Sequence, residues 1–209
     1  DPRNAAVLYV GTERTAYVSI NKGDSWINLS GESLPTIGVD DLKIQSRTHD
    51  LVAGTHGRSV WILDDASPLS QLSQDIVESE FHVFDPRPAQ PRFYFQYGDL
   101  WSDKMFIAQN PTMGAYLHYW IRDYEDESVS ISIADQNGHV VNTLSGTNRP
   151  GFNRVVWNLQ ADSAQQLGDP HNRTEFVAPG EYTVTIKHGE HDGKTSVQVL
   201  PTPGNAEKE

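Results

Sequence analysis

The sequence predicts an all-β protein, and three observations support this prediction. Short runs of β-branched and aromatic residues, separated by Gly, Asn and Asp, recur along all 209 residues. A stretch near the N-terminus is repeated at a spacing typical of all-β repeat proteins. After Ala115, apolar and polar residues alternate with the period of two that half-buried strands require.

The repeat occurs in two copies. Residues 8–12, Leu-Tyr-Val-Gly-Thr, recur as residues 51–55, Leu-Val-Ala-Gly-Thr, and Tyr17-Val18 recurs as Val60-Trp61. Both offsets are 43 residues, and a period of about 40–45 residues built from short strands is typical of four-stranded β-propeller blades. The predicted strands are residues 7–11, 16–20 and 25–29 in one blade and residues 39–46, 51–55 and 59–63 in the next.

Two incomplete blades cannot close a propeller, which needs at least about four. We therefore expect the chain to be the C-terminal part of a longer protein, whose upstream blades are its first partner. The outer strand missing from the second blade is expected from the N-terminus of that protein. Without these neighbours the sheets would expose unpaired edges and an apolar face, which favours aggregation.

A polar turn lies between the second and third strands of the first copy. Residues 19–26, Ser-Ile-Asn-Lys-Gly-Asp-Ser-Trp, resemble the Asp-box, S-x-D-x-G-x-x-W, of neuraminidase repeats. Asn21 stands in place of Asp and is expected to bond the turn backbone, while Gly23 supplies a positive φ. Trp26 is expected to bury its indole beneath the loop. We assign Ser19, Asn21, Gly23 and Trp26 a structural role, with ligand binding as the alternative.

The wider N-terminal stretch resembles the final blades of a bacterial family. Residues 8–14, the Asp-box, Asp41-Leu42 and residues 54–65 look like BNR/Asp-box or sortilin-type propellers, which are often labelled glycosyl hydrolases. The resemblance covers residues 5–75. It implies a large propeller in an exported protein, and hence an extracellular or periplasmic location, although the first residues carry no signal-peptide pattern.

A connector separates this region from the next. One helical turn is predicted at residues 67–72, with Ser67 as N-cap and Pro68 at the first helical position. Residues 84–92 contain three closely spaced prolines and are expected to be extended. Residues 93–114 are rich in aromatic side chains and are expected to form an ordered loop. The aromatic residues of 93–120 are interpreted mainly as core residues, with exposed ones as candidate contact residues.

The remaining residues predict a second domain. Asn137-Gly138 is expected to supply two left-handed positions to a hairpin turn, and residues 191–194 a turn before the last strand. Short strands at this density indicate a β-sandwich. The predicted strands are residues 115–121, 129–133, 140–144, 150–159, 179–186 and 195–199.

Two strings in this region carry a second resemblance. Residues 151–159, G-F-N-R-V-V-W-N-L, and residues 179–185, P-G-E-Y-T-V-T, resemble the immunoglobulin-like domain of flagellar hook-capping proteins. Such a match implies architecture and no activity. The domains are expected as propeller blades, connector, immunoglobulin-like sandwich and disordered tail, over residues 1–75, 76–114, 115–201 and 202–209.

Composition narrows the partners. The formal net charge is −12 and basic residues occur singly, which disfavours nucleic acid and anionic membranes. No apolar run is long enough for a membrane helix. Cysteine is absent, so disulfides and thiolate sites are excluded. We expect no cofactor.

Catalytic groups are also sparse. Glycoside hydrolysis needs two carboxyl groups that face each other across a sugar, whereas Asp40-Asp41 and Asp64-Asp65 place successive side chains on opposite faces of a strand. Asp64 and Asp65 are expected to cap the short turn that follows. His56 and Arg58 lie in a glycine-rich turn and are interpreted as groups that close the propeller or contact a ligand.

Metal binding is not expected. His171, His188 and His191 lack the spacing of a zinc site. A calcium site from Asp135, Asn137 or Asp162 would have no EF-type loop to support it.

The sequence therefore predicts a non-catalytic C-terminal module that closes a propeller and adds a sandwich, with a glycan or peptide as a possible ligand. The first alternative is part of a glycoside hydrolase whose catalytic carboxylates lie upstream. The second alternative is a sortilin-like propeller that binds a peptide.

Overall fold

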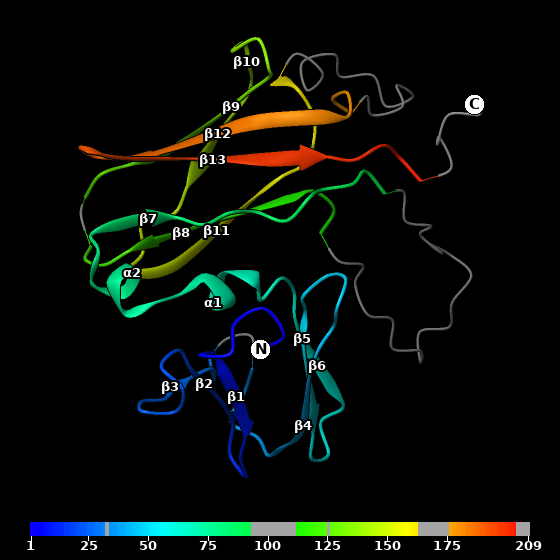
Figure 1. Cartoon of the computed structure of the whole chain (residues 1–209), viewed down its shortest axis with the longest axis vertical. Coiled ribbons are helices and arrows are strands. Elements are labelled where there is room, and N and C mark those ends of the chain that lie inside the picture. Colours follow the sequence, from blue (N-terminus) through cyan, green and yellow to red (C-terminus); the bar gives the residue numbers. More distant parts are fainter. Residues whose placement is uncertain (32–33, 93–111, 125, 163–175, 204–209) are drawn as a thin grey trace, which may run out of the picture. The chain divides into compact units, whose positions relative to one another are not determined.

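The structure, a computed structural model, describes residues 1–31, 34–92, 112–124, 126–162 and 176–203 (Figure 1). Over these residues the chain forms thirteen strands in four antiparallel sheets, with two short helices. The predicted all-β fold class is therefore confirmed. No helix in the described part of the chain has the length and apolar character needed to cross a bilayer.

The chain divides into two compact units, which are described separately. The first contains Asp1–Phe84, His118–Tyr124 and Arg149–Asn153. The second contains Asp85–Leu117, Glu125–Asn148 and Arg154–Glu209. The first unit thus extends beyond the predicted boundary at residue 75 and includes two short segments from the region predicted to be the sandwich.

Two three-stranded meanders make up most of the first unit. Sheet 1 has the order β1-β2-β3 and sheet 2 the order β4-β5-β6, each formed by strands consecutive in the chain. Tight hairpins allow this arrangement because antiparallel neighbours need only short connections. The strands are β1 (Leu8–Gly11), β2 (Ala16–Ser19), β3 (Ile27–Asn28), β4 (Val39–Ile44), β5 (Leu51–Thr55) and β6 (Val60–Leu63).

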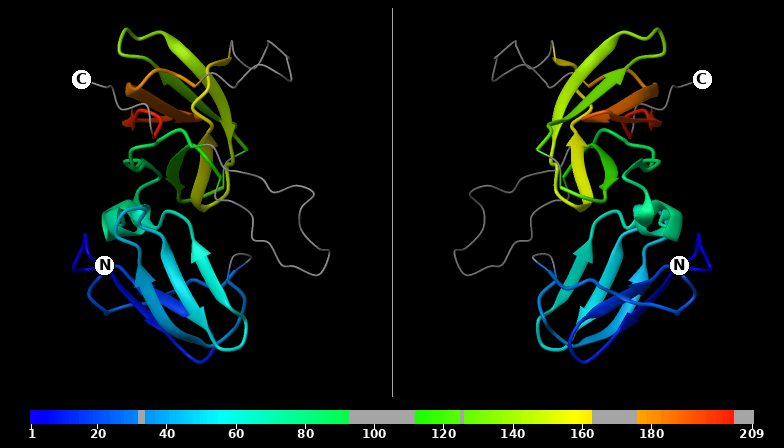
Figure 2. Two further views of the ribbon diagram at one scale, coloured as in Figure 1. Left: turned by 90° about the vertical axis from the view of Figure 1, so that its right-hand side faces the viewer. Right: turned by 90° about the vertical axis from the view of Figure 1, so that its left-hand side faces the viewer.

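Sheets 1 and 2 pack face to face around a small apolar core. Ala16 on sheet 1 shares one cluster with Val39 and Ala53 on sheet 2, and Trp61 packs against it. Tyr9 joins a second cluster with Leu51 and helix α1. Figures 1 and 2 show the two sheets side by side. The strands predicted for the two repeat copies are thus confirmed, with small differences at their ends.

Two short helices follow β6. Helix α1 (Ser67–Gln71) begins one residue earlier than predicted, because Ala66, and not Ser67, is its N-cap. Pro68 lies in its first turn, where a missing backbone N–H has no cost. Helix α2 (Gln74–Glu78), which the sequence analysis missed, is capped by Ser73, whose side chain accepts a hydrogen bond from the Ile76 backbone N–H.

The predicted connector contains ordered structure. Strand β7 (Phe81–Val83) pairs with β8 (Ala115–Ile121), whose other neighbour is β11 (Gly151–Trp157). This forms sheet 3, with the order β11-β8-β7. Beyond β7 the chain is extended as predicted, and the Ala89 backbone N–H donates to Gln198 O (2.8 Å). The aromatic residues 93–106 of the expected loop lie outside the described residues.

Sheet 4 forms much of the second unit. Its order is β10-β9-β12-β13. Alternate residues of β9 are buried, with Ser130 and Ser132 on the other face, as the period of two predicted. The core of the unit includes Ile131, Ile186 and Trp157, all fully buried. The strands are β9 (Val129–Ala134), β10 (Val140–Gly146), β12 (Gly180–His188) and β13 (His191–Val199).

Two predicted turns in this unit differ from the observed ones. In the hairpin between β9 and β10 only Gly138 has a positive φ (82°), whereas Asn137 does not. A hairpin loop that ends in one left-handed glycine needs a positive φ at that glycine only. Residues 191–194 are not a turn, because β13 already begins at His191 and pairs with His188. The turn is instead made at Gly189, whose φ is 56°.

Candidate functional site

The Asp-box loop is held by its own side chains. The Ser19 hydroxyl donates to Asn21 Oδ1 (2.9 Å), and Ser19 Oγ accepts from the Gly23 backbone N–H (2.8 Å). Asn21 Oδ1 also accepts from the Ser25 backbone N–H (2.9 Å). Gly23 has a φ of 100°, which favours glycine. The structural assignment of these residues is therefore supported by a closed set of bonds within the loop.

Trp26 lies against the loop but is not buried by it. Its side chain is 42% exposed, so the expected burial is wrong. A Cβ added to Gly23 would lie 3.7 Å from Trp26 Cζ2 and 3.7 Å from Leu8 Cδ1. Trp26 and Leu8 therefore both lie next to Gly23.

Replacing Asn21 should test the loop directly. In Asn21→Ala both hydrogen bonds accepted by Oδ1 are lost, and we expect the free energy of unfolding of the first unit to fall by about 1 kcal/mol. In Asn21→Asp the acceptor remains, so stability should stay close to that of the wild type. Urea denaturation of both variants measures the difference. Equal loss in both variants would show that the side-chain oxygen does not stabilise the loop.

His56 and Arg58 lie in the hairpin between β5 and β6. Thr55 closes this hairpin, because its backbone N–H and its hydroxyl both donate to Ser59 O (3.1 and 2.7 Å). His56 Nδ1 lies 3.5 Å from Asp40 Oδ2, and both side chains are largely exposed. Arg58 is exposed, and its backbone oxygen accepts from Trp61 Nε1 (3.1 Å). The described contacts of His56 and Arg58 thus connect parts of one sheet.

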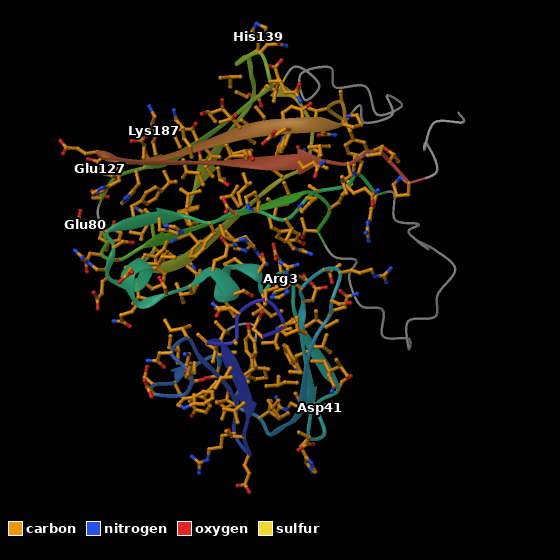
Figure 3. All side chains as sticks on the ribbon, in the orientation of Figure 1. Arg3, Asp41, Glu80, Glu127, His139 and Lys187 are labelled. Atoms are coloured by element: carbon orange, nitrogen blue, oxygen red, sulfur yellow. The ribbon has the colours of Figure 1, made fainter. Side chains whose placement is uncertain are left out.

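The Asp40-Asp41 pair is separated by a β-bulge. The β4–β5 register shifts between Val39 and Asp41, which leaves Asp40 as the extra residue. The bulge turns Asp40 toward His56, while Asp41 accepts a hydrogen bond from the Leu42 backbone N–H (2.9 Å). Figure 3 labels Asp41 at one end of sheet 2. The two carboxylates therefore have different partners, and the bulge replaces the regular alternation that the sequence predicted for them.

The contacts of Asp65 agree with the predicted role of this residue in capping the turn after β6. Its Oδ1 accepts from the backbone N–H (3.2 Å) and the hydroxyl (2.6 Å) of Ser67, at the start of α1. Its own backbone N–H donates to Asp50 Oδ1 (2.9 Å). The residue is 3% exposed and has a φ of 55°. Asp64 is half-buried beside it.

Sequence reasoning missed a buried polar group around His49. His49 Nε2 lies 2.7 Å from Ser70 Oγ and 3.1 Å from Asp1 Oδ2. These three residue types match a hydrolase triad, but a triad places serine and carboxylate on opposite ring nitrogens. Here both contact Nε2, and His49 is fully buried. The geometry is therefore that of a structural bridge between α1 and residues near Tyr9, and no spacing in the sequence signals it.

Tyr9 provides a pH-dependent test of this bridge. Its hydroxyl donates to Asp1 Oδ2 (3.0 Å), and burial raises the pKa of Tyr9 above its ordinary value of 10.0. The neutral phenol therefore stabilises the fold below about pH 10, and this contribution is lost as pH rises toward the folded pKa. Above pH 10, we expect the free energy of unfolding to fall more steeply in the wild type than in Tyr9→Phe, by up to about 1.4 kcal/mol per pH unit. Parallel curves for the two proteins in alkaline denaturation would contradict the buried phenol.

Metal ligation has no support in the described residues, which hold no group of three or more His, Cys, Asp or Glu side chains placed to bind an ion. Asp135 is instead occupied by its own turn. Hydrogen bonds from the backbone N–H groups of His139 and Asn137, the first the larger cause, hold its pKa below the ordinary value of 3.8. His171 lies outside the described residues.

The clearest candidate surfaces are the two faces of the repeat sheets that point away from each other. The register places Leu8, Val10 and Tyr17 on one face of sheet 1, which we call its back. Tyr9, Gly11, Ala16 and Val18 form its front, which packs against sheet 2. On sheet 2 the back meets sheet 1 and is formed by Leu51, Ala53, Trp61 and Leu63. The front of sheet 2 is open and is formed by Val52, Gly54, Val60 and Ile62.

The register also corrects the repeat. Tyr9 pairs with Val18, and its counterpart Val52 pairs with Ile62. The second strand of the repeat is therefore offset by 44 residues and not by 43, so Tyr17 corresponds to Trp61. With this correction, back corresponds to back and front to front. The two sheets stack head to tail, with the front of one on the back of the next.

Both outer faces expose apolar side chains, and the front of sheet 2 also carries Asp41 and Lys43. Leu8 and Val10 on the back of sheet 1 are 36% and 38% exposed. Val60 and Ile62 on the front of sheet 2 are 58% and 57% exposed. We therefore treat these two faces as candidate interaction surfaces.

No protein-family model matches the chain, and no curated protein sequence matches it. The arrangement of the two sheets is therefore the main observation from which a function can be inferred.

Proposed function

We propose that the chain is a non-catalytic C-terminal module of an exported β-propeller protein, in which sheets 1 and 2 are two of the blades. The head-to-tail stacking of the two sheets carries this proposal. A propeller repeats one stacking step around a ring, so every blade buries its front on the next blade and its back on the previous one. The packing of sheets 1 and 2 is compatible with one such step, and apolar side chains on their outer faces would allow a further step on each side.

Two equivalent glycines support the same assignment. A Cβ on Gly11, at the front of sheet 1, would collide with the backbone oxygen of Val39 on sheet 2. Its counterpart Gly54 lies at the open front of sheet 2, where a Cβ would meet only Asp41 of the same sheet. Contacts within its own sheet do not require a glycine at position 54. A glycine there is explained if the strand of a further blade approaches Gly54 as Val39 approaches Gly11.

The second unit, in this proposal, is an immunoglobulin-like sandwich that adds a binding or structural surface. Its four-stranded antiparallel sheet and its buried apolar side chains are compatible with that class. The hydrolase and peptide-receptor alternatives have no comparable support among the described residues. There the His56–Asp40 pair is exposed, and the buried Ser70–His49–Asp1 group lacks triad geometry.

The reading frame of the source gene, together with the intact mass of the natural protein, tests the proposal. We expect a longer protein with additional repeats of about 40–45 residues before Asp1. The strands of these repeats should carry a glycine at the position of Gly11 and Gly54. A natural protein that begins near Asp1, with no such repeats, would contradict the proposal.

A further inference from the structure

The two open faces of the repeat sheets correspond, through the repeat, to the two faces that pack against each other within the chain. The back of sheet 1 corresponds in the repeat to the back of sheet 2, which is buried in this chain. The front of sheet 2 corresponds to the front of sheet 1, which is also buried. We propose that the back of sheet 1 binds the front of sheet 2 of a second copy, so that isolated chains associate head to tail. This inference rests on the proposed function, because it uses the same stacking step.

The chemistry of the two faces suits this contact. Strands β1 and β2 contain no charged residue, and the exposed Trp26 lies near Gly23, as does Leu8 on the back of sheet 1. The front of sheet 2 presents Val60 and Ile62. Removing such side chains from water is favourable in proportion to the apolar area buried. Asp41 and Lys43 also lie on that front and have opposite charges. Burying this face in a contact would therefore leave no net charge from these two residues.

The repeat favours a back-to-front contact over a symmetric one. In this chain the back of sheet 2 carries Leu51, Ala53 and Trp61 and fits a front of Tyr9 and Ala16. The back of sheet 1 offers the related set Leu8, Val10 and Tyr17. A back-to-back contact has no precedent within the chain. A heterologous contact closes into a ring or grows as an open chain, and because a propeller has about four to eight blades, about two to four copies with two sheets each would close a ring.

Two charge substitutions test the two faces independently. Val10→Glu places a carboxylate on the back of sheet 1 and leaves the front of sheet 2 intact. Ile62→Glu does the reverse. In sedimentation velocity over a wide concentration range, we expect the mass of the wild type to rise with concentration and each variant alone to stay monomeric. A mixture of the two variants should form a one-to-one dimer, because each supplies the face that the other lacks.

The control is Thr183→Glu, an exposed position on β12 of the second unit, which should associate like the wild type. Circular dichroism checks that each variant is folded, and Leu8→Glu and Val60→Glu replace any variant that is not. A wild type that stays monomeric at every concentration would overturn the inference. So would a dimer of Ile62→Glu alone, which would indicate a back-to-back contact. Neither result affects the proposed function, which the length of the natural protein decides.

Discussion

Replacing Trp157 with alanine is expected to lower the free energy of unfolding of the second unit by about 3–5 kcal/mol. The side chain is fully buried, and its ring packs edge-on against Tyr182 with centroids 5.3 Å apart. Its Nε1–H donates to Gln160 O (2.9 Å). The substitution therefore removes a large apolar volume, leaves a cavity and deletes a hydrogen bond at once.

This effect is measured by urea denaturation, with hydrogen exchange of peptides from β12 and β13 to assign it to the second unit. Val140→Ala is the matched control, because Val140 lies on β10 of the same unit and is 60% exposed. That variant should stay within about 0.5 kcal/mol of the wild type. Similar losses in both variants would show that Trp157 is not the centre of this core.

The second large effect is expected from Gly11→Ala. The added Cβ would collide with the backbone oxygen of Val39, and backbone cannot rotate away as a side chain would. The two sheets must separate locally, and we expect the first unit to lose about 1–3 kcal/mol. Hydrogen exchange of β1 and β4 should quicken, since these strands meet at Gly11.

Gly54→Ala is the control for this prediction and holds the equivalent place in the second copy. Its Cβ would meet atoms of Asp41 only at ordinary van der Waals distances, 3.8 Å. The stability of this chain should therefore be almost unchanged. If Gly54→Ala destabilised the chain as much as Gly11→Ala, the loss would come from backbone preference and not from the approach of Val39.

Local patterns were sufficient to predict the strands. The runs that became β1, β5, β8 and β12 begin or end within a few residues of their expected positions. Such runs are read correctly because β-branched and aromatic residues fit a pleated, half-buried surface, whatever sheet they join. The capping role of Asp65 could also be predicted from the sequence, because the residue follows a strand and precedes Ser67-Pro68.

Some errors were local, such as the N-cap of α1 and the turn at Gly189. Others concern pairing and packing that the residue pattern leaves open. The burial of Trp26 depends on what covers the back of sheet 1. The offset of 44 residues depends on how β5 and β6 are paired. The His49 group joins residues that lie far apart in the chain, so no local spacing announces it.

The all-β class, the two copies of the repeat and the polar loop at Asn21 could be predicted from the amino-acid pattern, because each depends on neighbours within a few residues or on a constant period. Which face of each sheet is buried could be seen only in the folded chain. That choice follows from register, since a shift of one residue moves every side chain of a strand to the other face. With the register known, the front of one sheet meets the back of the next, and the outward faces become the places where a further sheet would bind.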